Sequence, residues 1–323
     1  MTLSFGVLGT ARIAEAFMYA ARVSPRVQVT AIGSRDPERG RAFAERHGVS
    51  RVCSYDDVLA DPNVDAVYIP LPNSMHAAWA IAAARAGKHV LCEKPLAIDE
   101  AEATAMFGAA EASGVVLLEA FPYQFQPQTL DVVRRVAAGE IGEIRSIQAS
   151  FGFTIANLDD IRFDPALAGG ALMDAGCYPV SLIRLLCGCR PSRVTAVALR
   201  AASGVDATLA ATLDYGRCLA QISCSMGTAV HRRAVIAGTA GVIETDYQNN
   251  TNGFAAPVNL VKHGTDWSAD FAAVPVPRED GFCLELEAFV DLIADRAGLA
   301  AYRAASLDNA WTLAAIRDAA ATR

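Results

Sequence analysis

The chain is short of the features that mark several specialised classes of protein. Its net charge of −7 gives no reason to expect a nucleic-acid partner, because such partners select for basic surfaces. Arg, Lys or Glu interrupts each Ala-rich apolar stretch, so we expect no membrane span. A strand is predicted from about Leu3, and we expect no signal peptide ahead of it.

Metal-type spacing is also missing. The eight cysteines are scattered, with Cys187 and Cys189 as the one close pair, and the five histidines are equally dispersed. Several cysteines lie in apolar segments, which favours buried, reduced thiols in the cytoplasm. What is present is a composition of 53% hydrophobic and 20% charged residues over 323 positions, which suits two globular domains.

Up to about residue 120, short apolar runs alternate with helical patterns. This alternation predicts a doubly wound parallel sheet, and continuous apolar runs suit strands that are buried on both faces. The predicted strands cover residues 3–8, 27–32, 66–69, 89–92 and 115–118, and the predicted helices cover residues 13–22, 37–47, 75–86 and 98–112.

After about residue 145, strand patterns follow one another with few helices between them, which predicts a large, mainly antiparallel sheet. We therefore expect an α/β protein with two domains, residues 1–120 and 121–323, and a cleft between them. The later strands are predicted at residues 144–153, 193–200, 207–214, 218–226, 234–237 and 242–245, and the helices at 170–187, 283–295 and 306–321.

The first predicted strand turns into the first helix at Gly9-Thr-Ala-Arg-Ile-Ala14, the place where dinucleotides bind in such sheets. Gly9 suits a tight turn, Ala11 puts a methyl group where the pyrophosphate approaches, and Ala14 permits close helix–strand packing. The helix N-terminus would offer N–H groups to phosphates. The strand–turn–helix context favours a dinucleotide site over a merely structural glycine.

The second predicted strand ends at Ser34-Arg35, where an NAD site would have an acidic residue for the ribose. A hydroxyl and a guanidinium there favour the 2′-phosphate of NADP, and Arg39 would add a second positive charge one helical turn later. Asp36 would repel that phosphate, unless it caps the next helix together with Pro37. A solvated turn with ordinary surface charge is the alternative.

Lys94 follows a predicted strand in the run Glu93-Lys94-Pro95. A lysine at the carboxyl end of a parallel strand points into the crevice where open α/β sheets bind ligands. Pro95 favours an extended backbone at Lys94 and so holds that residue in place. His76, in the loop after residues 66–69, either faces the cofactor or is a solvated residue at the start of a helix.

Asp174 and Tyr178 are four residues apart, so a helix places both on one face. Pro179 would kink that helix or confine it to an early turn. A tyrosine beside an ammonium group can relay a proton to a hydroxyl or carbonyl, with Asp174 holding a substrate hydroxyl or the lysine. The alternative is a surface aspartate and a packed tyrosine on an amphipathic helix.

These motifs, in order along almost the whole chain, resemble those of the glucose–fructose oxidoreductase/inositol dehydrogenase (Gfo/Idh/MocA) family. The most specific are Glu93-Lys94-Pro95 and Gly169-Gly-Ala-Leu-Met-Asp174-Ala-Gly-Cys-Tyr178, taken as a pair. The resemblance implies an N-terminal Rossmann domain, a C-terminal α/β domain whose open sheet often forms a dimer face, and a nicotinamide cofactor. It also implies that Lys94 is the catalytic lysine, Tyr178 the acid/base and Asp174 a substrate partner. The cofactor-binding residues that the resemblance implies are Gly9, Thr10, Ala11, Arg12, Ile13, Ser34, Arg35, Arg39, Leu71, Pro72, Asn73, His76, Glu93 and Lys94.

Tyr178 together with Ser34-Arg35 is similar to the NADP-using branch of the family, which contains xylose dehydrogenases, dihydrodiol dehydrogenases and sugar ketoreductases. Gln124 and Gln126 stand where that branch usually has Arg and His, so two cationic or titratable groups near the expected cleft are absent, which favours a neutral substrate.

We therefore predict a cytoplasmic, NADP(H)-dependent oxidoreductase, with NAD the less favoured cofactor. Its substrate would be a secondary alcohol or carbonyl of a sugar, cyclic polyol or related diol, and its state a homodimer or higher homo-oligomer. Two alternatives stay open: a dinucleotide-binding sensor or scaffold without turnover, and glycosidase chemistry through tightly bound NAD, which Ser34-Arg35 disfavours.

Overall fold

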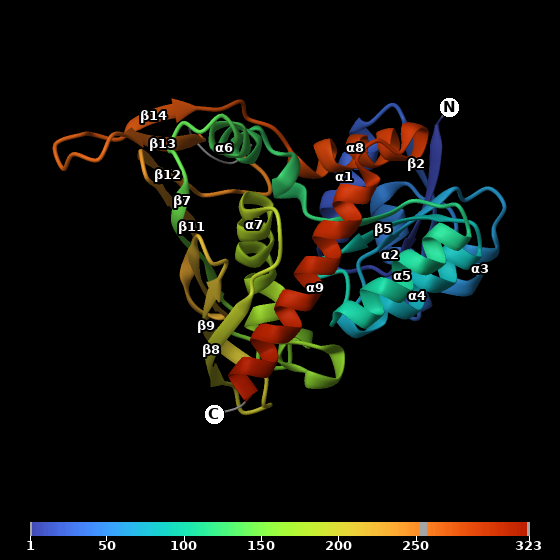
Figure 1. Cartoon of the computed structure of the whole chain (residues 1–323). Helices are drawn as coiled ribbons and strands as arrows, with labels where there is room; N and C mark the ends of the chain where they lie inside the picture. The colour runs from blue at the N-terminus through green and yellow to red at the C-terminus, as the bar shows by residue number, and fades with distance from the viewer. Residues whose placement is uncertain (1, 252–256, 322–323) are drawn as a thin grey trace. The chain divides into compact units, whose positions relative to one another are not determined.

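The protein, described here by a computed structural model over residues 2–251 and 257–321, divides into two compact units (Figure 1). Unit 1 comprises Met1–Phe121 and Phe282–Leu307, and unit 2 comprises Pro122–Gly281 and Asp308–Arg323. The first boundary lies one residue from the expected one. The later stretch of unit 1 holds most of helix α8 (Gly281–Asp295) and the start of helix α9 (Leu299–Ala321), both of which were expected in the second domain.

Unit 1 is built on a parallel sheet of six strands in the order β3-β2-β1-β4-β5-β6. The order reverses beside β1, so the carboxyl ends of β1 and β4 flank the switch point at which such sheets bind ligands. The doubly wound sheet is thereby confirmed. Its strands are β1 (Leu3–Leu8), β2 (Val27–Gly33), β3 (Val52–Cys53), β4 (Ala66–Ile69), β5 (His89–Glu93) and β6 (Leu117–Ala120).

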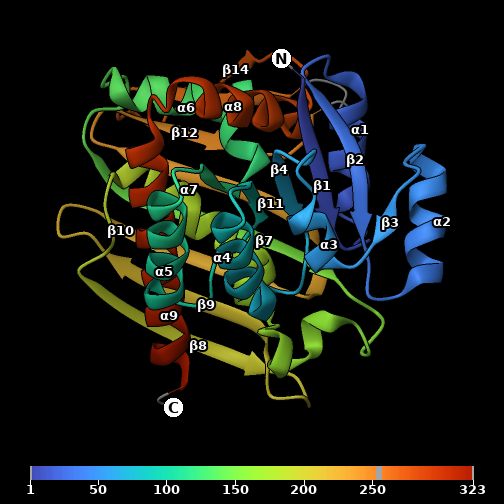
Figure 2. The ribbon, with the colours of Figure 1, turned by 90° about the vertical axis from the view of Figure 1, so that its right-hand side faces the viewer.

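Helices cover both faces of this sheet, and the alternation of side chains along β1 shows how. The ring of Phe5 meets Phe17 of α1 at 5.2 Å between centroids, whereas Gly6 points to the other face, where a Cβ would collide with Val58 of α3. On the α3 side, α4 and α5 lie side by side (Figure 2). The helices are α1 (Ala14–Val23), α2 (Pro37–His47), α3 (Tyr55–Ala60), α4 (His76–Arg85) and α5 (Glu100–Ala112), with a 3-10 turn at Asn73–Met75.

Helix α8 (Gly281–Asp295) packs on the Phe5 face of the same sheet. Phe289 lies 5.9 Å from Phe5 between ring centroids, and Glu287 accepts a hydrogen bond from Arg26 at 2.9 Å. Arg26 and Glu287 are 261 positions apart in the sequence. No local pattern could therefore have assigned α8 to this unit.

Unit 2 contains an eight-stranded sheet in the order β14-β13-β12-β11-β7-β10-β9-β8. Only β7 and β10 pair in parallel; the other neighbours are antiparallel, as predicted. The strands are β7 (Ile144–Thr154), β8 (Arg193–Arg200), β9 (Asp206–Asp214), β10 (Leu219–Ser225), β11 (Gly227–Gly238), β12 (Gly241–Thr245), β13 (Val258–His263) and β14 (Ala272–Pro275), of which β13 and β14 were not predicted.

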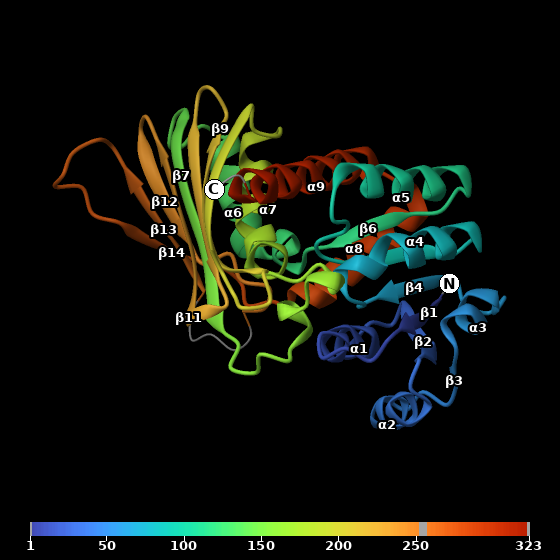
Figure 3. The ribbon, with the colours of Figure 1, turned by 90° about the horizontal axis from the view of Figure 1, so that it is seen from below.

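The helices of unit 2 lie on one face of this sheet (Figure 3). They are α6 (Pro127–Ala137), which was not predicted, α7 (Cys177–Cys187) and the part of α9 (Leu299–Ala321) that follows Leu307. A π-helical turn at Leu172–Gly176 precedes α7, so the single helix expected over 170–187 is a π turn followed by an α-helix. Short 3-10 turns occur at Pro122–Phe125, Ile161–Phe163 and Pro165–Leu167.

One helical segment within the described residues, Pro165–Cys187, is long and apolar enough to cross a membrane by length and composition alone, with a mean hydropathy of 1.3 in an 18-residue window. We had expected charged residues to interrupt every Ala-rich apolar stretch, and this segment does not fit that expectation. Of that window, 72% is buried inside the fold. Its apolar character is therefore accounted for by packing against the sheet of unit 2.

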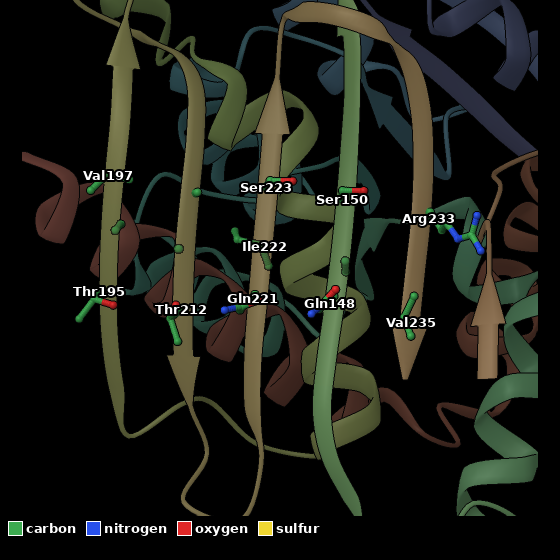
Figure 4. Close-up of a pocket in the computed structure, with 14 residues that line it drawn as sticks. Gln148, Ser150, Thr195, Val197, Thr212, Gln221, Ile222, Ser223, Arg233 and Val235 are labelled. Carbon is green, nitrogen blue, oxygen red and sulfur yellow. The ribbon is translucent and has the colours of Figure 1, made fainter. Parts of the chain in front are cut away.

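The opposite face of the eight-stranded sheet carries no helix of the described part of the chain (Figure 3). Strand alternation sends Ala220 and Ile222 into the core and Gln221 and Ser223 outward. The outward side chains line a hollow of about 620 Å³ (Figure 4). Those seen there include Gln148, Ser150, Thr195, Val197, Thr212, Gln221, Ser223, Arg233 and Val235.

Candidate functional site

Gly9 makes the turn between β1 and α1 as expected. Its φ of +112° lies in the region that favours glycine, and a Cβ there would lie 3.0 Å from Leu71 Cδ2. Ala14 is completely buried at the start of α1, which is the close helix–strand packing predicted for it. The backbone at Gly9 thus passes close to Leu71, which follows β4.

Asp36 caps α2, as one of the two interpretations of the sequence required. Its carboxylate accepts hydrogen bonds from the backbone N–H groups of Glu38 and Arg39, both at 3.0 Å. Ser34 Oγ donates to the carbonyl of Asp36 at 2.7 Å. Because two backbone donors already engage the Asp36 carboxylate, its repulsion of a nearby phosphate is weakened.

A basic hollow of about 320 Å³ lies beside the Gly9 turn. Arg39 reaches into it from α2 and donates to the carbonyl of Thr10 at 3.3 Å, while Arg35 is exposed at the end of β2. Glu15 is the one acid in its lining, and its hydrogen bond from Arg46 holds the pKa of that carboxyl below its usual value. The lining residues are Thr10, Arg12, Glu15, Arg39, Ala42, Phe43 and Arg46.

The other residues expected at a cofactor lie at the same carboxyl edge of the sheet. Arg12 and Ile13 are exposed at the entrance to α1. Leu71 is buried after β4, and Pro72 and Asn73 begin the 3-10 turn that follows.

Lys94 stands directly after β5 and precedes a cis peptide bond to Pro95. Buried carboxylates bracket this loop. Glu93 Oε1 accepts from Tyr68 Oη at 2.6 Å, and Glu119 Oε1 accepts from the backbone N–H of Leu96 at 2.9 Å. The residues on each side of Lys94 are therefore held by side chains from neighbouring strands.

His76 occupies neither of the positions that the sequence analysis weighed. It is completely buried, so it neither faces a cofactor nor lies in solvent. Its Nδ1 is 2.9 Å from the carbonyl oxygen of Pro95, and its Nε2 is 2.8 Å from that of Leu71. Burial of a polar ring requires such partners, and here they join the loop after β4 to the loop that carries Lys94.

Asp174 lies in the π-helical turn of unit 2 and forms an ion pair with Arg162, whose Nε donates to Asp174 Oδ2 at 2.5 Å. Arg162 also contacts Asp160 at 3.2 Å. The expected partners of Asp174 were a substrate hydroxyl or the lysine, and Arg162 was not among them. A fixed carboxylate results, because the arginine side chain holds it from one side.

Tyr178 lies in the first turn of α7 and is buried within unit 2. Its Oη accepts a hydrogen bond from Asn249 Nδ2 at 2.9 Å. The guanidinium of Arg232 lies 4.2 Å from the centroid of its ring. Neither Asn249 nor Arg232 was singled out from the sequence.

Gln126 does not face a cleft, contrary to the interpretation of this loop from the sequence. It is completely buried, and its Nε2 donates to the backbone carbonyls of Asn249 at 2.9 Å and Glu279 at 2.8 Å. Gln124 donates to Ser181 Oγ at 2.8 Å. The amide at position 126 is thus a structural clamp, so its neutrality says nothing about substrate charge.

Comparison with known families covers both units. Residues 3–121 match the model of the oxidoreductase family with an NAD-binding Rossmann fold (GFO_IDH_MocA), and residues 129–244 match the model of the GFO/IDH/MocA C-terminal domain. The chain belongs to the Gfo/Idh/MocA family. The resemblance inferred from the motifs is thereby confirmed.

Relatives within the Gfo/Idh/MocA family are similar over most of their length. A D-xylose 1-dehydrogenase (NADP(+)) from Haloferax volcanii is 40% identical over 79% of this chain and 79% of its own. A trans-1,2-dihydrobenzene-1,2-diol dehydrogenase from Sus scrofa is 34% identical over 76% of this chain and 74% of its own. The crystal structure of a 3-ketoreductase from Actinomadura kijaniata, in complex with NADP and TDP-benzene, has a TM-score of 0.90 and 32% identity, and 98% of each chain is covered.

Three residues that contact Asp174 or Tyr178 were not predicted from the sequence: Arg162, Arg232 and Asn249. A signal existed for Arg232, because strand alternation within Arg232-Arg233 places one arginine inward and the next outward. No comparable signal existed for the other two, since their contacts depend on loops.

Within the described residues, no group of three or more His, Cys, Asp or Glu side chains could hold a metal ion.

Proposed function

We propose that this protein is an NADP(H)-dependent oxidoreductase that acts on a secondary alcohol or carbonyl of a sugar, cyclic polyol or related diol. The observation that carries the proposal is similarity along most of the chain to relatives named for such reactions, the D-xylose 1-dehydrogenase and the dihydrodiol dehydrogenase. The choice of NADP over NAD, made from Ser34-Arg35, agrees with the name of the first of these and with the NADP-bound 3-ketoreductase.

The residues of the Gly9 turn fit a dinucleotide. A side chain at Gly9 would fill the space beside Leu71, and the adjacent hollow offers Arg12 and Arg39 to phosphate oxygens. Arg35, at the end of β2, would bind the 2′-phosphate, and the Ser34 hydroxyl would join it by turning from the Asp36 carbonyl to a phosphate oxygen. When bound, the nicotinamide accepts or supplies the hydride of the reaction.

We assign to Tyr178 the transfer of the proton to and from the reacting oxygen of the substrate. In reduction its phenol donates the proton to the carbonyl oxygen, and in oxidation it takes the proton of the substrate hydroxyl. Lys94 stabilises the negative charge that develops on the same oxygen. Asp174, held by Arg162, accepts a hydrogen bond from a second substrate hydroxyl.

The proposal is tested by a screen of neutral sugars, cyclic polyols and diols for NADP reduction or NADPH oxidation. The Tyr178→Phe and Lys94→Ala variants should each lower kcat by roughly 10²–10⁴-fold, the usual scale of acid–base catalysis, with NADPH affinity near that of the wild type. Wild-type turnover in both variants would contradict the assigned roles. NADPH binding without turnover of any compound in the screen would favour the sensor or scaffold.

The same proposal includes a homodimer formed through the outer face of the eight-stranded sheet. That face carries polar side chains such as Gln148 and Gln221 as well as exposed apolar ones such as Val197 and Leu219. Mixed faces of this kind are common in interfaces between subunits. A cytoplasmic location agrees with the eight cysteines, all of which are free thiols.

A further inference from the structure

Arg232 is a buried cation without an acidic partner among the described residues. It lies on β11 and is 8% exposed, and it takes part in no ion pair within the described chain. Its Nε and Nη2 make no hydrogen bond there either. A buried charge is costly unless something compensates it, so the groups around the guanidinium have to be explained.

Aromatic rings surround the guanidinium. The distances from Arg232 Cζ to the ring centroids are 4.2 Å for Tyr178, 4.5 Å for Tyr247, 5.0 Å for Phe151 and 5.4 Å for Tyr123. All four lie within the range of a cation–π interaction, which is strongest where water is excluded. The negative faces of these rings therefore compensate part of the arginine's charge.

Two of the three phenols in this cage, those of Tyr247 and Tyr123, donate hydrogen bonds to oxygen atoms that do not belong to Arg232 or Asn249. Tyr247 Oη donates to the carbonyl of Ser150 at 2.8 Å, and Tyr123 Oη donates to Ser181 Oγ at 2.8 Å. Burial raises the pKa of both the Tyr123 and the Tyr247 phenol, so these two keep their protons.

The oxygen of the third phenol, Tyr178, accepts a hydrogen bond from an amide that Arg232 orients. Arg232 Nη1 donates to Asn249 Oδ1 at 3.2 Å, which orients the amide so that Asn249 Nδ2 donates to Tyr178 Oη at 2.9 Å. The clamp from Gln126 holds the backbone carbonyl of the same asparagine. The bond that Tyr178 accepts from Asn249 strengthens when the phenolic oxygen becomes an anion.

We propose that Arg232 is a positioning residue that stabilises the tyrosinate formed when Tyr178 gives up its proton. It acts through its charge beside the ring and through the amide of Asn249. The inference rests on the proposed function for its catalytic meaning, but the stabilisation of the anion can be measured without substrate or cofactor.

The experiment is an ultraviolet titration of tyrosinate. The signal of Tyr178 is the difference between each protein and the same protein with Tyr178→Phe. The Arg232→Gln variant should raise the midpoint of that signal by about 1–3 pH units, the usual effect of an opposite charge at this range. The Arg232→Lys variant, which keeps the charge, should recover most of the shift.

Arg233→Gln is the matched control. Arg233 is the next residue on β11, points to the outer face and pairs with Glu244, so its loss should leave the midpoint unchanged. If Arg232→Gln fails to fold by circular dichroism, Asn249→Ala replaces it, and a smaller rise of the midpoint is expected because one hydrogen bond is lost.

An unchanged midpoint in the folded Arg232 or Asn249 variant would overturn the inference. So would an equal rise in Arg233→Gln. If no substrate is found for the wild type, the proposed function fails while the titration still decides the role of Arg232. Where turnover is present, the basic limb of the kcat–pH profile of Arg232→Gln should move in the same direction as the titration.

Discussion

The two ring nitrogens of His76 span the backbone carbonyls of Leu71 and Pro95, at 2.8 Å and 2.9 Å. This buried imidazole links the loop after β4, which lies against Gly9, to the loop that carries Lys94. The expected cofactor turn and the expected catalytic lysine are thus joined inside unit 1 by one side chain. Its position makes it a structural support for both loops.

The His76→Ala variant should be less stable by about 1–3 kcal/mol, because burial lowers the pKa of His76 and the one carbonyl to which the neutral ring donates is left unpaired. Urea unfolding measures this. The loosened Lys94 loop should also lower kcat in any turnover assay. His231→Ala, at an exposed position, is the control and should change neither quantity. Equal stability of the two variants would show that His76 does not support these loops.

The Arg35→Ala variant should raise the KM for NADP by about 10–100-fold and leave the KM for NAD nearly unchanged. The physical reason is the loss of a charge-assisted hydrogen bond to the 2′-phosphate, which NAD lacks. Parallel kinetics with the two cofactors measure the difference. Arg41→Ala, an exposed arginine on α2, is the control. An equal effect on both cofactors would overturn the assignment of NADP specificity to Arg35.

Asp206 should make the stability of unit 2 depend on pH. Burial raises the pKa of this carboxyl to about 6, although Oδ2 accepts from the backbone N–H of Leu172 at 2.6 Å. Because the folded-state pKa lies above the unfolded value, the folded state binds the proton more tightly. The stabilising contribution is complete below about pH 4 and is lost as the pH rises through 6.

The size of this contribution is about 2–3 kcal/mol, from a shift of about two pKa units in a mostly buried group. Asp206→Asn should reduce the difference in stability between pH 4 and pH 7 by this amount, as measured by urea unfolding at both values, while other buried groups such as Glu285 keep their own contributions. Asp270→Asn, at an exposed position, should retain the full difference. If the stability of the wild type and of Asp206→Asn changes by the same amount between pH 4 and pH 7, this account is refuted.

The proposed dimer predicts that charge on the outer face of the eight-stranded sheet separates the subunits. Thr212→Lys combined with Ser223→Lys places two like charges in the hollow on β9 and β10, and repeats them across a twofold axis. Sedimentation velocity should then show a monomer with an unchanged circular dichroism spectrum. The control is Arg134→Lys on α6, outside that face. An unaltered sedimentation coefficient in the double variant would exclude this face as the interface.

Local sequence patterns were sufficient for many elements. The strand Leu3–Leu8 and the helix Pro37–His47 have the predicted bounds. For α2 the reason is plain, since Asp36 caps its start and Gly48, at a φ of +69°, ends it. The two-residue strand β3 and the six-residue α3 were missed because neither is long enough to show a period, although Ser54 and Asp57 form a capping box that marks the start of α3.

The sequence by itself determined the class of sheet in each unit, the Gly9 turn and the motifs that identify the family, whereas the cap at Asp36 was one of two interpretations. Each depends on periodicity or on backbone geometry within a few neighbouring residues. Only the tertiary structure decided that His76 and Gln126 are buried clamps, that Asp174 pairs with Arg162 and that Arg232 lies over Tyr178. Those outcomes depend on which distant side chains share a buried space, because a polar group there must find a partner wherever the fold supplies one.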